Sequence, residues 1–313
     1  MKAANAVLCF GALHFDSIAE CIGPYRARAS NPVRTHRTPG GVAHNIARNL
    51  AQLSLPVGMA SLIGDDDGDL LVRTLDSYGI DHQLVHRHHQ FTSASYIAVL
   101  DETGELAVGL ADMAIYDAMD VALVSGMLAQ AEHWPGWIID ANLPEEAICY
   151  LADHHGDRPL YLAPVSVAKA PRVKPALGRA DVMICNKYEI EALSGLGADT
   201  ALEAARAAAS LQQSDRQILV VTLGPDGAVL VTKDEVLHFP APPTRVVDVN
   251  GAGDSFFSGF VAAHRSGGTA VGAVRHGLAK ASLTAESHDP VNPAFTLQAL
   301  EQREQAVPAP ITL

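Results

Sequence analysis

The chain has 313 residues, of which 48% are hydrophobic and 18% are charged, an ordinary balance for a globular protein with a large buried core. Its formal net charge is −13, from 22 Lys and Arg against 35 Asp and Glu. This acidic excess argues against nucleic acid or an anionic membrane as the main partner. Phosphate ligands stay open, because backbone N–H groups bind anions without any lysine.

Cysteine usage fits a reducing compartment. The four cysteines form no C-x-x-C pair, and Cys9 and Cys185 fall in apolar runs, where a thiol behaves as a small hydrophobe. The apolar run at 6–10 is too short, and too soon followed by Gly11 and Asp16, for a signal peptide or a membrane span. We therefore expect a cytoplasmic protein.

Short apolar runs alternate with longer helical patterns, which is typical of a parallel sheet covered by helices. Strands are expected at 6–10, 57–63, 137–140, 159–163, 182–185, 218–222 and 228–232. Helices are expected at 42–54, 67–78, 121–131, 144–154, 201–213, 254–264 and 269–287. Several of the strands are apolar without alternation, as strands covered on both faces should be. The pattern predicts a single α/β domain over residues 1–313.

Two stretches interrupt this alternation. Residues 12–38 are polar and irregular, and residues 91–112 predict a hairpin, two β-rich runs around Asp101-Glu-Thr-Gly104. Together they predict a small β-sheet lid inserted into the α/β body. Such an insertion can be a mobile cover over a cleft or a dimer contact.

The sharpest chemical signal is the run Asp248-Val-Asn-Gly-Ala-Gly-Asp254, which leads into an expected helix. Its glycines let the backbone approach a phosphate closely, and free N–H groups at a helix start bind anions. Asp254 can accept a proton from an attacking hydroxyl while those N–H groups stabilise the transferred phosphoryl group. Taken alone, the motif is more often a plain N-cap Asp after a glycine turn.

Two further motifs predict a hydroxyl-bearing ligand nearby. Gly40 and Gly41 open a helix that carries Asn45, in the pattern G-G-x-x-x-N, and an Asn side chain offers both a donor and an acceptor. Asp16 follows the first strand, at the carboxyl end of the sheet, where open α/β sheets bind ligands. Its carboxylate suits two neighbouring sugar hydroxyls. Alone, Asp16 is more typical of a loop and Asn45 of a solvated helix face.

Two motifs are expected on the nucleotide side. The turn Thr222-Leu-Gly-Pro-Asp-Gly227 lies between two expected strands, and its backbone either cradles phosphates or forms a simple hairpin loop. Asn186 and Glu189 follow an apolar strand and could organise Mg²⁺ through waters, because Mg²⁺ keeps much of its hydration. The alternative for this pair is a helix N-cap with an acidic first turn.

Other motifs carry less. The spacing of four histidines fits no zinc template and indicates a solvated loop that approaches the lid: His82, His86, His88 and His89. No G-x-G-x-x-G follows the first strand, which disfavours a dehydrogenase. The absence of G-x-x-x-x-G-K-[ST] disfavours a P-loop kinase.

The motifs together, in this order over nearly the whole chain, resemble the ribokinase-like carbohydrate kinase family. The resemblance rests on Asp16, the G-G-x-x-x-N helix, Asn186-x-x-Glu189, the turn at 222–227 and the block at 248–254. It implies a three-layer α/β/α body with a mostly parallel central sheet. It also implies a small β lid that commonly forms a homodimer contact.

The resemblance also implies a role for each motif. Asp254 would be the base that deprotonates the acceptor hydroxyl, beside an anion hole made by Gly251, Ala252 and Gly253. The sugar would contact Asp16, Gly40, Gly41 and Asn45. ATP would contact Asn186, Thr222, Gly224 and Gly227. Mg²⁺ would lie near Glu189 through water, and a monovalent cation is compatible with the family.

Within the family, four stretches resemble the pseudouridine kinases most: 30–32, 38–50, 92–113 and 164–166 with Lys169. This implies transfer of the ATP γ-phosphate to the 5′-hydroxyl of pseudouridine, a small-molecule substrate. Polar lid residues are then expected near the base or ribose: Thr92, Ser95 and Asp112. Two alternatives stay open, a kinase for another sugar or nucleoside such as ribose or adenosine, and a non-catalytic nucleotide- or sugar-binding protein. Asp254 speaks against the second.

Overall fold

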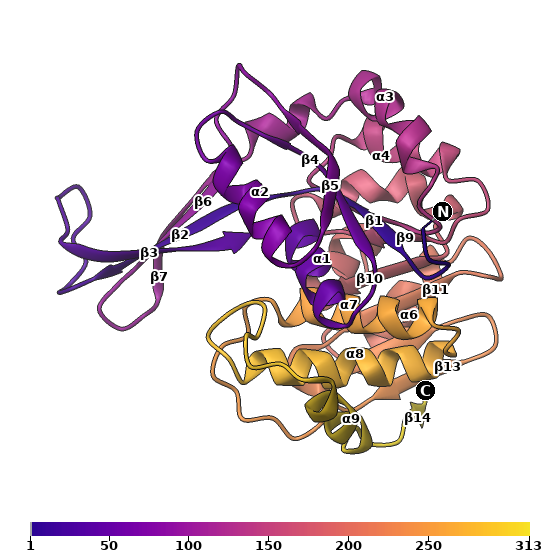
Figure 1. Cartoon of the computed structure of the whole chain (residues 1–313). Helices are drawn as coiled ribbons and strands as arrows, with labels where there is room; N and C mark the ends of the chain where they lie inside the picture. The colour runs from indigo at the N-terminus through magenta and orange to yellow at the C-terminus, as the bar shows by residue number, and fades with distance from the viewer. Residues whose placement is uncertain (1) are drawn as a thin grey trace.

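The computed structural model describes residues 2–313 and is built around a ten-stranded sheet (Figure 1). Its strands are β1 (Val7–Phe10), β4 (Val57–Ile63), β5 (Asp81–Arg87), β8 (Trp137–Asp140), β9 (Leu160–Ala163), β10 (Val182–Asn186), β11 (Ile218–Thr222), β12 (Ala228–Val231), β13 (Val236–Phe239) and β14 (Ile311–Thr312). Their order across the sheet is β14-β13-β12-β11-β10-β9-β8-β1-β4-β5. From β11 to β5 every neighbouring pair is parallel, while β12, β13 and β14 are antiparallel.

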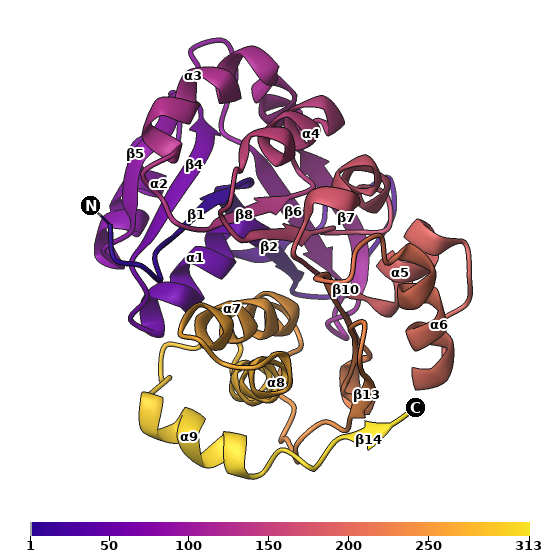
Figure 2. The same cartoon turned by 90° about the vertical axis from the view of Figure 1, so that its right-hand side faces the viewer.

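Helices cover both faces of this sheet, as Figure 2 shows. They are α1 (Val42–Gln52), α2 (Gly68–Ser77), α3 (Val121–Ala131), α4 (Glu145–His154), α5 (Lys187–Ser194), α6 (Ala201–Leu211), α7 (Ala252–Arg265), α8 (Ala270–Ala285) and α9 (Leu297–Gln305). Residues of α3, α4, α5 and α6 share one apolar cluster with one face of the sheet. Residues of α1, α2, α7 and α8 share another with the opposite face. The expected α/β/α fold is confirmed.

The strands and helices expected from hydrophobic periodicity all form, with their ends shifted by three residues or fewer. The periodicity missed α5, α9, β5 and the antiparallel edge strands β13 and β14. These elements are short or carry polar residues on an exposed side, so their apolar signal is weak. β5, for example, contains two histidines and has a single buried residue, Leu84.

The lid is a separate four-stranded sheet with strands β2 (His14–Cys21), β3 (Val33–Gly40), β6 (Ser95–Leu100) and β7 (Leu106–Asp112). Their order is β3-β2-β6-β7, and the sheet projects away from the body (Figure 1). The expected hairpin around Asp101 is the β6–β7 turn. The small β-sheet expected from residues 12–38 and 91–112 forms, with β2 and β3 paired over eight residues, although the bounds of these two strands were not predicted. Their polar sequence reflects exposure, since most of β3 is open to solvent.

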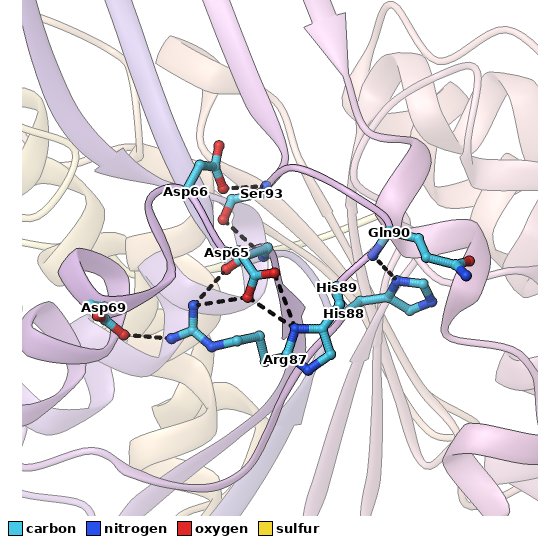
Figure 3. Close-up of polar contacts among 9 residues, drawn as sticks. Asp65, Asp66, Asp69, Arg87, His88, His89, Gln90 and Ser93 are labelled. Atoms are coloured by element: carbon cyan, nitrogen blue, oxygen red, sulfur yellow. Dashed lines mark hydrogen bonds and ion pairs between the residues drawn. The ribbon is translucent and has the colours of Figure 1, made fainter.

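An acidic tripeptide after β4 lies where the lid meets the body, and each of its carboxylates contacts a different group. Figure 3 shows the contacts of Asp65 and Asp66. Asp65 Oδ2 lies 3.0 Å from His89 Nδ1. Asp66 Oδ1 accepts the backbone N–H of Ser93, which leads into β6, at 2.8 Å. Asp67 pairs with Arg37 of lid strand β3. Asp66 therefore contacts the segment that leads into β6, and Asp67 contacts lid strand β3.

The histidine-rich segment belongs to this anchoring region. His82 contacts Asp76 at 2.9 Å and His89 contacts Asp65, both at the surface. Among residues 2–313 no three His, Cys, Asp or Glu side chains are grouped as metal ligands would be. The same residues include no helix that is both long and apolar enough to cross a membrane.

Candidate active site

Polar residues from distant parts of the chain meet at the carboxyl edge of the parallel strands. β1, β8, β10 and β11 end at this edge, and α1 and α7 begin beside it. Parallel strands place all their carboxyl ends on one side of a sheet, where ligands bind in open α/β folds. The site is thus assembled by topology rather than by one continuous motif.

The start of α7 presents unpartnered backbone N–H groups. Gly251 is the N-cap and has a φ of +74°, a left-handed conformation that favours glycine. The amide of Ala252 donates to the carbonyl of Val249 at 3.2 Å. Within residues 2–313 the amides of Gly251, Gly253 and Asp254 have no acceptor. These N–H groups, at the positive end of a helix dipole, suit an oxyanion or phosphate.

Asp254 lies in the first turn of α7, half-buried, with Asn45 of α1 as its hydrogen-bond partner. Asn45 Nδ2 donates to Asp254 Oδ2 at 2.9 Å, and the buried Asn45 Oδ1 has no partner among the described residues. Burial raises the pKa of Asp254 to about 7. The Asn45 hydrogen bond lowers that pKa, while the nearby charges of Asp140, Glu189 and Asp16 raise it. A pKa near neutrality suits a general base.

Asp16 of β2 lies against the glycine pair that precedes α1. A Cβ atom on Gly40 would lie 2.2 Å from Asp16 Oδ2, so only glycine leaves room for this carboxylate. Gly41 has a φ of +97°, and a Cβ there would lie 2.5 Å from the Ala12 carbonyl oxygen. His14 Nε2 is 3.2 Å from Asp16 Oδ1. The structure therefore brings Asp16, the glycine pair and Asn45 together, as the motifs predicted.

Asp140, at the end of β8, is a central residue that the motif analysis did not single out. It is fully buried, and its two oxygens accept four hydrogen bonds from three segments. Oδ2 accepts from Ala12 N and Ala43 N, each at 3.0 Å, and from Asn142 Nδ2 at 3.0 Å. Oδ1 accepts from Asn142 N at 2.8 Å. Burial raises the pKa of Asp140, and these donors oppose that rise.

Asp140 joins the loop after β1 to the start of α1, because Ala12 and Ala43 belong to those segments. A Cβ on Gly11 would lie 2.2 Å from Asp140 Cγ, so the loop packs directly on the carboxylate. The signal for Asp140 was present in the sequence, since it ends an apolar strand as an acidic residue at the ligand-binding edge.

Asn142 and Lys169 extend the Asp140 network. The Lys169 ammonium contacts Asn142 Oδ1, and the carbonyls of Asn142 and Leu143 accept from Arg172 Nη1 at 3.1 and 3.3 Å. Burial lowers the pKa of Lys169, while the charge of Asp140 raises it. This network makes the loop after β8 rigid beside the carboxylates.

The nucleotide-side motifs lie next to each other on adjacent strands. Asn186 and Thr222 are paired residues at the ends of β10 and β11. The turn after Thr222 is a short 3₁₀ helix, η3 (Gly224–Asp226), closed by Gly227, whose φ of +91° requires glycine. The sequence thus forms a β11–β12 hairpin whose turn lies at the same edge as the anion-binding amides.

Asn186 and Glu189 form a capping box at the start of α5. Asn186 Oδ1 accepts from the amides of Tyr188 and Glu189, and Glu189 Oε2 accepts from Asn186 N at 3.0 Å. The helix-cap interpretation of this pair is therefore correct. Burial raises the pKa of Glu189. Each carboxylate oxygen keeps a further lone pair, so contact with the water shell of Mg²⁺ is compatible with the cap.

The three lid residues expected at the substrate are not grouped with Asp16. Strand pairing aligns Ser95 with Phe15 and with Asp112, so these side chains share one face of the lid. Asp16 is paired with Thr38 and Tyr96 in the next row, whose side chains point to the opposite face. Thr92 and Asp112 are exposed. The register thus adds Tyr96 to the face that carries Asp16.

Comparison with known proteins agrees with this geometry. Residues 4–296 match the model of the pfkB family of carbohydrate kinases. The chain belongs to this family. A pseudouridine kinase from Escherichia coli (strain K12) is 29% identical over 263 residues, covering 83% of this chain and 83% of its own length. A guanosine-inosine kinase from Exiguobacterium acetylicum is 26% identical over 260 residues, covering 81% and 86%.

Solved structures with a similar fold are also sugar or nucleoside kinases. Ribokinase of Arabidopsis thaliana complexed with ribose and ATP superposes with a TM-score of 0.83 at 19% identity, covering 96% of this chain and 98% of that one. As a pfkB kinase, this chain is a phosphotransferase with a hydroxyl group as acceptor.

Replacing Asp140 by Asn should destabilise the protein. The amide nitrogen of Asn would face N–H donors that now bind a carboxylate oxygen, and an unmet buried donor costs about 1–3 kcal/mol. We expect a loss of about 2–4 kcal/mol in the free energy of unfolding, measured by urea denaturation. Asp157→Asn, at an exposed position, is the control and should change little. Equal stabilities of the two variants would contradict the role given to Asp140.

The raised pKa of Asp254 predicts the pH dependence of turnover. Below pH 7 the carboxyl group is protonated and cannot accept the hydroxyl proton, so kcat/KM for the acceptor should fall about tenfold per pH unit. Above pH 7 the rate should level off. Asn45→Ala removes a hydrogen bond that lowers this pKa, so its inflection should move to higher pH. The ionisation of ATP is the same in assays of the wild type and of Asn45→Ala. If the inflection in kcat/KM does not move, the titrating group is not Asp254.

Proposed function

We propose that this chain is a nucleoside kinase that transfers the γ-phosphate of ATP to the 5′-hydroxyl of pseudouridine, giving pseudouridine 5′-phosphate. One observation carries the chemistry. The Asp254 carboxylate lies beside free N–H groups at the start of α7 and is bonded to Asn45, whose Oδ1 has no partner in the described chain. Base, anion site and an acceptor for a ligand hydroxyl are therefore contiguous.

The proposed mechanism uses each of these groups. Asp254 accepts the proton of the 5′-hydroxyl as its oxygen attacks the γ-phosphorus. The free amides of Gly251, Gly253 and Asp254 stabilise the charge on the equatorial oxygens of the phosphoryl group. Asp16 accepts hydrogen bonds from ribose hydroxyls, and the Gly40–Gly41 backbone holds that carboxylate in place. The carboxylates of Asp16 and Asp254 thus orient and activate one substrate.

ATP is proposed to lie along the ends of β10 and β11. Asn186, Thr222 and the Gly224–Gly227 turn present polar and backbone groups at that edge. Mg²⁺ would neutralise charge on the ATP phosphates, and Glu189 is proposed to contact its water shell. A monovalent cation near the anion hole remains part of the proposal.

The choice of pseudouridine is supported by the similarity to the Escherichia coli enzyme over 83% of the chain. The lid adds a physical argument for a nucleoside. Tyr96 shares the Asp16 face, and an aromatic ring gives a base an apolar contact surface. Thr92, Ser95 and Asp112 remain proposed contacts that depend on how the lid closes.

A substrate panel tests the proposed activity. The chain is assayed with ATP and Mg²⁺ against pseudouridine, uridine, adenosine, inosine, guanosine and ribose, and we expect the highest kcat/KM for pseudouridine. Asp254→Asn should keep acceptor binding and lose about 10²-fold or more in kcat, because the base is gone. A better acceptor than pseudouridine would reject the substrate, and near-normal turnover of Asp254→Asn would reject the mechanism. If none of these acceptors is phosphorylated, the result would favour a non-catalytic binding protein.

We also propose that the lid forms a homodimer contact. The face opposite Asp16 carries apolar residues that are open to solvent, with Ile97 and Leu110 paired in one row. Exposed apolar groups on a projecting sheet are typical of an interface. Light scattering should give twice the chain mass, and Leu110→Lys should lower it toward 33.0 kDa. Leu202→Lys, also exposed but on α6, is the control. A monomeric wild-type protein would contradict this contact.

A further inference from the structure

Lys280 of α8 is buried without a carboxylate partner. Its side chain is 0% exposed and makes no ion pair within the part of the chain that is described. The ammonium Nζ donates to Gln52 Oε1 of α1 at 2.9 Å and lies 3.9 Å from the centroid of the Phe295 ring. Burial lowers its pKa to about 7. Such a group is costly to bury, so its contacts need an explanation.

Lys280 fixes the orientation of the Gln52 amide. An ammonium group only donates hydrogen bonds, so Gln52 must turn its oxygen toward Lys280 and its nitrogen away. Gln52 Nε2 then donates to the carbonyl of Asn292 at 2.8 Å. Asn292 Nδ2 in turn donates to the carbonyl of Leu283 at 2.6 Å. The ammonium thus begins a series of hydrogen bonds, here called the relay, that runs through Gln52 to Asn292 in the segment between α8 and α9.

That segment, residues 286–296, packs against the anion hole. A Cβ atom on Gly251 would lie 2.3 Å from the carbonyl oxygen of Pro290 and 2.5 Å from its Cα. The last residue of α8, Ala285, accepts from Val247 N at 2.7 Å and from Asp248 N at 3.2 Å. The turn that carries the free amides therefore rests on a segment that Gln52 and Phe295 hold in place.

We propose that Lys280 is a positioning residue for the anion hole, acting through Gln52 and Asn292 on the segment that supports Gly251. It touches neither substrate nor the reacting atoms. Its ammonium fixes the orientation of the Gln52 amide, and the hydrogen bond from Gln52 to Asn292 fixes the position of the nearby Pro290 backbone against the glycine turn. Because oxyanion donors act only within a narrow range of distances, a small displacement of this turn weakens transition-state stabilisation. This inference rests on the proposed role of the 251–254 amides.

The test separates positioning from stability with two variants. Lys280→Met removes the donor, and Gln52→Glu keeps an acceptor for Lys280 but replaces the donor to Asn292 with an oxygen. Both should lower kcat about tenfold, with KM for ATP and acceptor within about twofold, because the lost interaction acts in the transition state. The double variant should be no worse than either single one, since both interrupt the same relay. Gln52→Glu also tests the proposal if Lys280→Met fails to fold.

Val274→Ala is the matched control. Val274 is fully buried near the start of the same helix, so its truncation lowers stability without touching the relay. At a temperature where all variants are folded, its kcat should equal that of the wild type. Unchanged kcat in both relay variants, or additive losses in the double variant, would overturn the proposal.

A second readout needs no acceptor. Peptide-level hydrogen exchange at residues 247–255 should be faster in Lys280→Met and in Gln52→Glu, and unchanged in Val274→Ala. This measurement holds even if pseudouridine proves to be the wrong substrate, so the two proposals can fail independently. Unchanged exchange in both relay variants would remove the link between Lys280 and the glycine turn.

Discussion

The site depends on one buried carboxylate, Asp140, which no solvent reaches. It accepts amides from the loop after β1, from the start of α1 and from the loop after β8. Helix starts and strand ends carry unpaired N–H groups, which must find acceptors when buried. The Asp140 carboxylate accepts three such N–H groups, and it thereby fixes where α1 begins relative to the sheet. The positions of Gly41 and Asn45 follow from that, and so does the partner of Asp254.

The same edge concentrates negative charge, and this decides how the site works. Asp16, Asp140 and Glu189 all raise the pKa of Asp254, in addition to the effect of burial. Like charges in a partly desolvated cleft disfavour ionisation, which makes the base more basic. The anion-binding groups opposite these carboxylates are backbone amides rather than lysines. In the proposed mechanism these amides would bind the transferred phosphate, and they carry no full positive charge that would lower the pKa of Asp254.

Much of the fold could be predicted from the periodicity of hydrophobic residues in the sequence, because buried parallel strands and amphipathic helices have strong local patterns. Glycine motifs also marked the starts of α1 and α7, since Gly41 and Gly251 adopt positive φ values that other residues avoid. The anion hole at Gly251 remains a proposal. The distant partners of Asp140 and Lys280 could not be assigned from local pattern, because Ala43 and Gln52 lie 97 and 228 residues away from them. The lid itself was expected from residues 12–38 and 91–112, but the bounds of its first two strands were not, because β3 is polar and has a single buried residue, Gly40. Asn186 and Glu189 fitted two interpretations, of which the structure shows the helix cap, while their contact with a ligand stays a prediction.

Tight packing at three glycines constrains the relative positions of segments that are far apart in the sequence. Gly11 lies on Asp140, Gly40 on Asp16 and Gly251 on Pro290, each at a distance that no side chain permits. At Gly251 the contact is backbone against backbone, so a displacement of Pro290 passes directly to the turn, whereas Gly11 and Gly40 contact the carboxylate side chains of Asp140 and Asp16. The three groups proposed to bind the sugar, accept the proton and bind the phosphate are therefore packed against the loops behind them. The supporting residues act as part of the site even though they never meet the substrate.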